Sequence, residues 1–135
     1  MTMLSENVLS TFHDSFDRCR DNPRFFDLFY ERFLQSSDEI EAIFNGVDIE
    51  RVKKMVRDAL LFILIASDGS SHGIQRINNL GRAHREWRIE NHHYDLWLES
   101  LMSTVEEIDP LYSQNVDSAW REVMSIGIHI MKRNT

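Results

Sequence analysis

Two stretches place histidines where they could bind a metal ion or exchange a proton. One is LGRAHREWRI, residues 80 to 89, which contains His84, and the other is HHY, residues 92 to 94. A metal-binding histidine needs a neutral imidazole presented from a rigid element, with its second ring nitrogen held by a carbonyl, a carboxylate or water. His84 falls near the end of an expected helix, which suits that role. Taken alone, it could equally be a surface residue or a buried hydrogen-bonding residue.

The remaining histidines carry a weaker signal. They are His13, His72, His92, His93 and His129. No pair among them forms a persuasive metal-binding motif together with a carboxylate. We therefore expect these five side chains to be surface or hydrogen-bonded residues.

The composition indicates one globular domain spanning residues 1–135. Of the 135 residues, 42% are hydrophobic and 10% aromatic, enough for a sizeable core. The formal net charge of -7 argues against nucleic acid as a partner, because nucleic-acid binders normally carry a basic surface. A single cysteine, Cys19, forms no internal disulfide and is expected to be buried in the first helix. No signal peptide is recognisable and no apolar run approaches the roughly 18 residues of a membrane span, so we expect a cytoplasmic protein without a membrane partner.

The spacing of hydrophobic residues predicts helices throughout, so the expected fold class is all-α. Apolar residues recur every three to four positions, and no segment alternates with the period of two that a strand needs. The expected helices cover about residues 5 to 20, from 23 onward, 36 to 44, from 48 through 66, 74 to 87, 92 to 108, and 113 to 132. Two prolines, Pro23 and Pro110, fall at junctions between these segments.

Two of these segments are expected to lie at the centre of the fold. The helix from Pro23 carries five aromatic residues, too many for one narrow stripe. The helix after Asp48 ends in LLFILIA, residues 60 to 66, which is apolar all round and should be deeply buried. The polar run SDGSSHG, residues 67 to 73, is expected to be the main loop.

Two long stretches resemble a known family. FYERFLQSSDEIEAIF, residues 29 to 44, and LGRAHREWRIENHHYDLWLESLM, residues 80 to 102, are similar to bacterial globins of the flavohaemoglobin, single-domain and sensor-globin group. The resemblance covers nearly the whole chain, and Trp120 matches the frequent tryptophan of the family's last helix. It implies a globin fold of about seven helices in three-over-three packing around haem b, which is iron protoporphyrin IX.

The spacing of five residues carries the resemblance further. Phe44 stands where the family has its haem-packing phenylalanine, and Tyr30, fourteen residues earlier, matches the distal tyrosine. His84 matches the iron ligand, and Ile89 and Tyr94 fall on the family's next two pocket positions. A helical residue one turn before His84, Leu80, is then expected to pack beneath the porphyrin.

On the distal side the chain departs from its relatives. When Val56 is aligned 28 residues before His84, the family's distal polar position holds Val52, so a distal glutamine or histidine is missing. Val52 and Val56 are then expected to line the haem pocket, and Tyr30 becomes the leading hydrogen-bond donor to a bound gas. A one-residue slip would instead place Arg51 at the pocket mouth. Val52 is preferred, because it continues the apolar face of its helix.

On the proximal side the resemblance implies a weaker polarisation of His84. The family's polarising glutamate would fall after Thr135, so the imidazole is expected to donate to a backbone carbonyl or to water.

Flavin and nicotinamide domains are not expected on this chain. Reversible binding of O2, CO or NO, for storage or for sensing through a separate signalling protein, is therefore favoured. Nitric-oxide dioxygenation with an external reductase, and a haem-free interaction protein, are the alternatives. The chain is expected to be a monomer or a homodimer.

Overall fold

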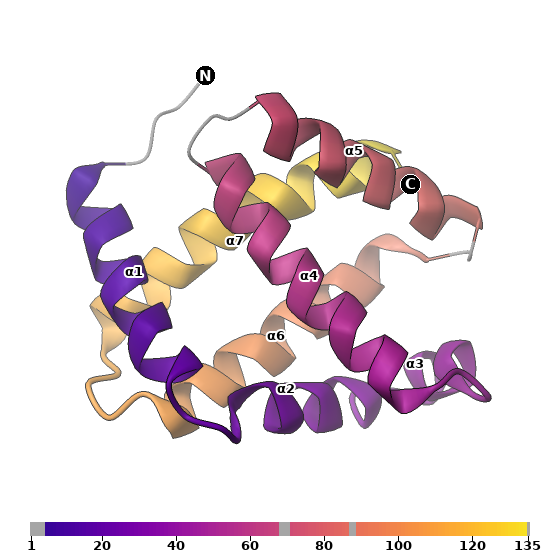
Figure 1. Cartoon of the computed structure of the whole chain (residues 1–135), viewed down its shortest axis with the longest axis horizontal. Coiled ribbons are helices and arrows are strands. Elements are labelled where there is room, and N and C mark those ends of the chain that lie inside the picture. The colour runs from indigo at the N-terminus through magenta and orange to yellow at the C-terminus, as the bar shows by residue number, and fades with distance from the viewer. Residues whose placement is uncertain (1–4, 68–70, 87–88, 135) are drawn as a thin grey trace.

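The described part of the chain forms seven helices and no strand, which confirms the predicted all-α class. The computed structural model describes residues 5–67, 71–86 and 89–134, without the side chains of residues 56, 66, 67, 85, 86 and 134. The helices are α1 (Glu6–Arg20), α2 (Phe25–Leu34), α3 (Asp38–Phe44), α4 (Ile49–Ser67), α5 (Ser71–Glu86), α6 (Asn91–Ile108) and α7 (Gln114–Asn134), labelled in Figure 1.

Polar side chains fix where several helices begin. The hydroxyl of Ser5 accepts a hydrogen bond from the Val8 N–H at 3.2 Å, and that of Ser37 accepts one from the Ile40 N–H at 3.1 Å. Both serines have extended backbone, as residues preceding a first helical turn do. At the end of α3, Gly46 takes φ of +82°, a conformation in which a side chain would be strained. These local signals place α3 as a short helix between α2 and α4.

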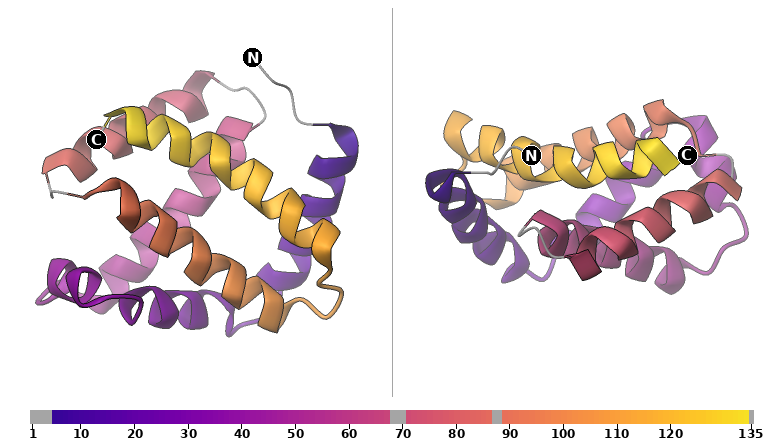
Figure 2. Two further views of the ribbon diagram at one scale, coloured as in Figure 1. Left: turned by 180° about the vertical axis from the view of Figure 1, so that it is seen from behind. Right: turned by 90° about the horizontal axis from the view of Figure 1, so that it is seen from above.

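The helices pack in two layers. Seen from above in Figure 2, α6 and α7 lie in one layer and α4 and α5 in the other. Helix α7 contacts α1, α4, α5 and α6, and α2 contacts α4 and α6. This layering agrees with the predicted three-over-three globin packing. Helix α4 is thereby brought against α7, which follows it much later in the chain.

A close approach joins the two layers where α4 crosses α7. A Cβ atom placed on Gly127 would lie 2.4 Å from Cγ1 of Ile63, closer than nonbonded atoms come. Ile63 is completely buried, so the branched side chain fills the space that the glycine leaves. Gly127 therefore permits the two helix backbones to approach at this point.

An aromatic cluster fills the α1 end of the interior. Trp120, on α7, is fully buried, and its ring meets that of Phe12 edge-on, with the centroids 4.8 Å apart. Phe16 and Phe25 lie farther out, with centroids 6.1 Å and 6.4 Å from Trp120. The edge-on contacts of Phe12 and Phe16 with Trp120 are favourable beyond the burial of apolar surface, whereas the Phe25 ring is tilted. Aromatic residues of α1, α2 and α7 thus pack together in one cluster.

A polar network anchors the same end. The carboxylate of Asp109 accepts hydrogen bonds from Arg18 Nε at 2.6 Å and Nη2 at 2.9 Å, and from the Ser15 hydroxyl at 2.6 Å. The backbone N–H of Leu111 donates to it at 2.9 Å, and Trp120 Nε1 donates to the Ser15 hydroxyl at 2.8 Å. Because Asp109 is only 3% exposed, its charge is stable here only with these donors in place.

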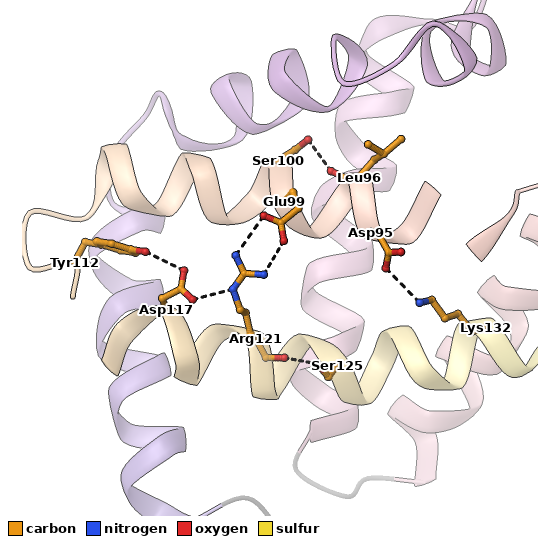
Figure 3. A network of polar contacts seen from close by, with 9 residues as sticks. All are labelled: Asp95, Leu96, Glu99, Ser100, Tyr112, Asp117, Arg121, Ser125 and Lys132. Carbon is orange, nitrogen blue, oxygen red and sulfur yellow. Dashed lines mark hydrogen bonds and ion pairs between the residues drawn. The ribbon is translucent and has the colours of Figure 1, made fainter. Parts of the chain in front are cut away.

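Exposed ion pairs connect α6 to α7 along their length. Figure 3 shows Arg121 reaching Glu99 on α6 at 2.7 Å and Asp117 on its own helix at 2.8 Å. Farther along, Lys132 of α7 lies 3.3 Å from Asp95 of α6. Pairs as exposed as these contribute about 0 to 1 kcal/mol each, so they fix the register of the helices more than they stabilise the fold.

The prediction that LLFILIA is deeply buried is wrong in part. Leu60 and Ile63 are completely buried, but Leu61 is 38% and Ile65 is 43% exposed. The neighbours of α4 are α2, α5 and α7, and they cover only part of its circumference. On the remaining side, Leu61 and Ile65 line an open surface groove next to Phe16 of α1.

Two helix boundaries also differ from the prediction. Helix α2 begins at Phe25, because the Asn22 side chain accepts a hydrogen bond from the Arg24 N–H at 2.9 Å and keeps Pro23 in a turn. Helix α5 begins at Ser71, three residues before the expected start. Ser67 belongs to α4, so the predicted polar loop is shorter than expected, and residues 68–70 lie outside the described part of the chain.

Replacing Asp109 by asparagine is expected to lower the free energy of unfolding by about 2–3 kcal/mol at neutral pH, since it leaves Arg18 without its partner in a largely buried site. Burial alone raises the pKa of the Asp109 carboxyl, but the hydrogen bonds from Arg18 and Ser15 lower it by more, so the net pKa lies below its usual value. The stabilisation that the ionised Asp109 carboxylate provides is therefore present above the pKa of this carboxyl in the unfolded chain, near 3.9. It is lost as the pH falls through the pKa of the carboxyl in the folded protein. Urea denaturation from pH 7 down to pH 3 measures it.

Asp95→Asn is the matched control, because Asp95 is an exposed carboxylate paired with one lysine. Its effect should stay within about 0.5 kcal/mol. Equal losses of stability for the two variants would mean that the buried network contributes no more than a surface ion pair.

Candidate functional site

The six helices α2 to α7 and the segment after α5 surround one predominantly apolar cavity. It encloses about 70 Å³, within a hollow of about 570 Å³ that includes the space at its open mouth. The lining side chains are Phe33, Ile40, Phe44, Met55, Ala59, His84, Ile89, His93, Tyr94, Trp97 and Met131. An apolar hollow of this size with a few convergent polar groups is typical of small-molecule and cofactor sites.

His84 brings an imidazole into this apolar setting. It lies in the last turn of α5, and its carbonyl accepts a hydrogen bond from the Ile89 N–H at 3.0 Å, which helps turn the chain towards α6. Burial lowers the pKa of the imidazole to about 4, because charging the ring in an apolar cavity is unfavourable. At neutral pH the ring is uncharged and keeps one lone pair.

The hydroxyl of Tyr94 is a polar neighbour of that ring. It lies 3.1 Å from His84 Nδ1, and the two ring centroids are 5.7 Å apart. The expectation that His84 donates to a backbone carbonyl or water therefore needs correction. Tyr94 stands ten residues later on α6, and the packing of α6 beside the end of α5 places its hydroxyl at this nitrogen. When Nδ1 carries the proton and donates to Tyr94, Nε2 keeps the lone pair that a metal ion requires.

Four of the residues singled out from the sequence lie together in the lining. They are Phe44, His84, Ile89 and Tyr94. Phe44 projects from the last turn of α3 and packs edge-on against Phe33, with ring centroids 6.0 Å apart. The cavity is thus closed on one side by aromatic rings and on another by the His84–Tyr94 pair.

Three other predicted site residues, Val52, Leu80 and Tyr30, are not among the described lining residues. Val52 is 1% exposed and Arg51 is exposed, so the valine is the one buried in the fold. Leu80 is half-buried and packs against the core, and Tyr30, on α2, is 9% exposed. Val56 lies in α4, but its side chain is outside the described residues. The roles expected of these four apolar and aromatic side chains remain predictions.

Tyr30 has a charged neighbour that the sequence pattern does not reveal. The ammonium of Lys53 lies 5.8 Å from the centroid of the Tyr30 ring and 3.1 Å from a carboxylate oxygen of Asp27. A cation over an aromatic face contributes about 0.5–1 kcal/mol at exposed sites. This contact ties the first half of α4 to α2 on the side of Tyr30.

Sequence reasoning missed seven lining residues. They are Phe33, Ile40, Met55, Ala59, His93, Trp97 and Met131. Six are apolar or largely apolar and fit the general pattern of buried helix faces, so the sequence left them at least equally compatible with core packing. His93 is the exception, because it was expected to have no special role and is 5% exposed at the cavity wall.

The comparisons with known proteins agree on one family. A crystal structure from Pseudomonas aeruginosa PAO1, of a protein described as structurally highly homologous to a human hemoglobin, superposes with a TM-score of 0.87. The two chains are 32% identical, and the match covers 94% of this chain and 97% of that one. A group 1 truncated hemoglobin from Tetrahymena thermophila is 28% identical over 81 residues, which is 60% of this chain and 62% of the relative, less than two thirds of its length. No protein-family model matches the chain.

The chain belongs to the bacterial globin family. The identity and the near-complete structural overlap carry this assignment, together with the seven-helix globin fold. Within the described residues, no helix is both long and apolar enough to cross a membrane.

Tyr94→Phe is expected to alter the state of the His84 ring. Removing the hydroxyl leaves Nδ1 without its 3.1 Å neighbour, at a cost of about 1 kcal/mol in the free energy of unfolding. Nitrogen-15 NMR of the ligand-free protein should show a changed balance between the two neutral tautomers of His84. Tyr112→Phe is the control. It also removes a partly buried hydrogen bond, which the Tyr112 hydroxyl donates to Asp117 at 2.9 Å, but this residue does not line the cavity. Unchanged His84 resonances in Tyr94→Phe would contradict the assigned contact.

Proposed function

We propose that this globin binds haem b in the apolar cavity, with His84 as the axial iron ligand, and that it reversibly binds a diatomic gas. The observation that carries the proposal is a neutral imidazole in an apolar hollow of a globin fold. When bound, haem supplies an iron with a coordination position for O2, CO or NO. The chain would act as an oxygen store, or as a gas sensor through a separate partner.

The lining residues fit a porphyrin in their chemistry. A flat, mostly hydrophobic ring is complementary to aromatic and aliphatic side chains such as Phe33, Phe44 and Ile89. The enclosed space of about 70 Å³ is smaller than a porphyrin, so uptake requires the hollow to widen towards its mouth. Met55 and Met131 are suited to that movement, because methionine is unbranched and adapts its shape at low cost.

His84 and Tyr94 would act together on the proximal side. With the ring proton on Nδ1, the Tyr94 hydroxyl would accept it, which would fix the ring orientation and leave Nε2 as the ligand atom. A hydroxyl is a weaker acceptor of that proton than a carboxylate, so the imidazole stays more nearly neutral and donates less electron density to the metal. This favours gas binding over sustained oxygen chemistry.

Tyr30 would supply the hydrogen bond to the gas on the opposite side. Its hydroxyl is the leading candidate donor, because Val52 occupies the position at which relatives carry a polar residue, and Val52 has no donor. A valine at that position would also keep water away from a bound gas. A hydrogen bond made without competing water is stronger than one at the surface.

The test of the proposal is haem uptake by the purified chain and by His84→Ala. The parent protein is expected to take up one hemin per chain, with a Soret band that shifts when CO is added to the reduced protein. His84→Ala should lose the fixed axial bond and alter the spectrum, while hydrophobic contacts retain part of the porphyrin affinity. His72→Ala is the matched control, since His72 is an exposed histidine on the same helix.

Two results would overturn it. A parent protein that stays colourless with excess hemin would favour a haem-free interaction protein. A spectrum and ligand kinetics that are the same in His84→Ala as in the parent would exclude His84 as the axial ligand.

Tyr30→Phe is expected to speed the release of dioxygen. Loss of one buried hydrogen bond to a polarised ligand costs roughly 1–3 kcal/mol, which corresponds to about a five- to hundred-fold faster dissociation. Release of CO should change much less, because CO is less polar. Stopped-flow measurements of both gases separate the two effects. A dioxygen off-rate within two-fold of the parent would make Tyr30 a packing residue.

A further inference from the structure

A second group of ligand-type side chains lies outside the cavity. The Oε2 atom of Glu39, on α3, is 2.8 Å from His92 Nε2 and 2.8 Å from His93 Nε2, both on α6. The two imidazole rings are 4.2 Å apart between centroids. One nitrogen from each histidine and one carboxylate oxygen all lie within 4.8 Å of one another, and no ion is present among them.

The three residues span from the surface to the cavity wall. The side chains of Glu39 and His92 are 63% and 50% exposed, so a dissolved ion can reach them. The side chain of His93 is 5% exposed, and it lines the cavity. Ile40, next to Glu39 in the chain, lines the cavity as well.

We propose that Glu39, His92 and His93 form a binding site for a zinc ion. Two imidazole nitrogens and one carboxylate oxygen are a ligand set that zinc accepts, with water in the fourth position, whereas Mg²⁺ and Ca²⁺ prefer oxygen alone. A tetrahedral zinc ion with bonds near 2.0–2.1 Å holds its ligand atoms about 3.3 Å apart. Small side-chain movements are enough to reach that spacing from the present one.

His92 lies between two carboxylates. Its Nδ1 atom lies 3.4 Å from a carboxylate oxygen of Glu90, while Nε2 faces Glu39. Because Nε2 lies 2.8 Å from the Glu39 carboxylate, the metal-free ring donates its Nε2 proton there. On zinc binding that proton moves to Nδ1, where the Glu90 carboxylate can accept it, and Nε2 offers its lone pair to the ion. Such a carboxylate behind a metal-binding histidine commonly strengthens coordination.

His93 must exchange a proton between its two nitrogens to join the site. Its Nδ1 accepts a hydrogen bond from the Glu90 N–H at 2.8 Å, so in the metal-free protein the neutral ring carries its proton on Nε2 and donates it to Glu39. On binding zinc, that proton moves to Nδ1 and the bond to the Glu90 N–H breaks. No proton is released from His93, and the start of α6 loses one capping contact. Zinc binding is thus coupled to a change at the cavity wall.

Isothermal titration of the full chain with ZnCl2 tests the site. We expect one zinc ion per chain, with affinity reduced at least about ten-fold in Glu39→Gln and in His92→Ala. Both side chains are at least half exposed, so these variants should keep the fold, which circular dichroism can check. CaCl2 should give no comparable heat.

Two control variants separate this site from other histidines and carboxylates. Glu41→Gln changes an exposed carboxylate on the same short helix, and His84→Ala removes the imidazole of the cavity. Zinc affinity should be unchanged in both. The second control removes the cavity imidazole as a competing zinc ligand.

A spectroscopic signature distinguishes coordination by His93 from binding to His92 and Glu39 alone. Zinc should shift the backbone amide resonance of Glu90 and move the proton of the His93 ring to Nδ1 in nitrogen-15 spectra. Absence of zinc binding, binding that survives both Glu39→Gln and His92→Ala, or binding lost in His84→Ala would overturn the proposal. Binding with an unperturbed His93 ring would overturn the three-residue site.

Discussion

The uncharged imidazole of His84 is the constraint on which the arrangement of the site depends. An imidazole in an apolar cavity loses the water that would stabilise its charged form, so burial keeps it neutral. A neutral ring still has one donor and one acceptor nitrogen, and a buried polar atom without a partner is costly. The Tyr94 hydroxyl lies 3.1 Å from Nδ1, so Nε2 is the nitrogen that remains for a ligand. This contact joins His84 in the last turn of α5 to Tyr94 in the first turn of α6.

The two ends of the molecule hold different kinds of interior. Around Trp120 and Asp109, rings and charged groups meet their partners closely, and one carboxylate receives four hydrogen bonds, from Ser15, Leu111 and two nitrogens of Arg18. At the end where α5 meets α6, the same helices separate enough to leave a cavity. Between the two ends, Gly127 lets α7 approach α4 closely. A well-packed end and a close crossing permit the other end to remain hollow without loss of a defined fold.

Helix class and most boundaries could be predicted from the sequence, because local signals determine them. Ser5 and Ser37 cap helices through their own hydroxyls, and Asn45-Gly46 ends α3 at a residue with positive φ. The exposure of Leu61 and Ile65 could not be predicted, because an apolar run that covers all sides of a helix does not indicate which side its neighbours leave open. Helix packing decides that, and packing is not local.

The candidate site was predictable only in part for a related reason. The spacing of the pocket positions in globins identified Phe44, His84, Ile89 and Tyr94 in the sequence, and all four line the cavity. It did not reveal that the Tyr94 hydroxyl faces His84, because the side-chain direction depends on how α6 crosses the end of α5. The contact of Glu39 with His92 and His93 joins residues more than 50 positions apart, a separation at which no sequence motif operates.

His93 links the cavity to the protein surface. One of its nitrogens is engaged by the first backbone amide before α6 and the other by Glu39 on α3, so its ring cannot turn without breaking one of these bonds. The next residue, Tyr94, faces the His84 ring. A change in the charge or ligation of the exposed Glu39–His92 pair therefore acts on a ring that forms part of the cavity wall and on the helix start that positions Tyr94. Since α3 also contributes Ile40 and Phe44 to the lining, the same change reaches the cavity from two helices. The hydrogen bonds of one histidine thus determine how closely events at the surface are coupled to the geometry around His84.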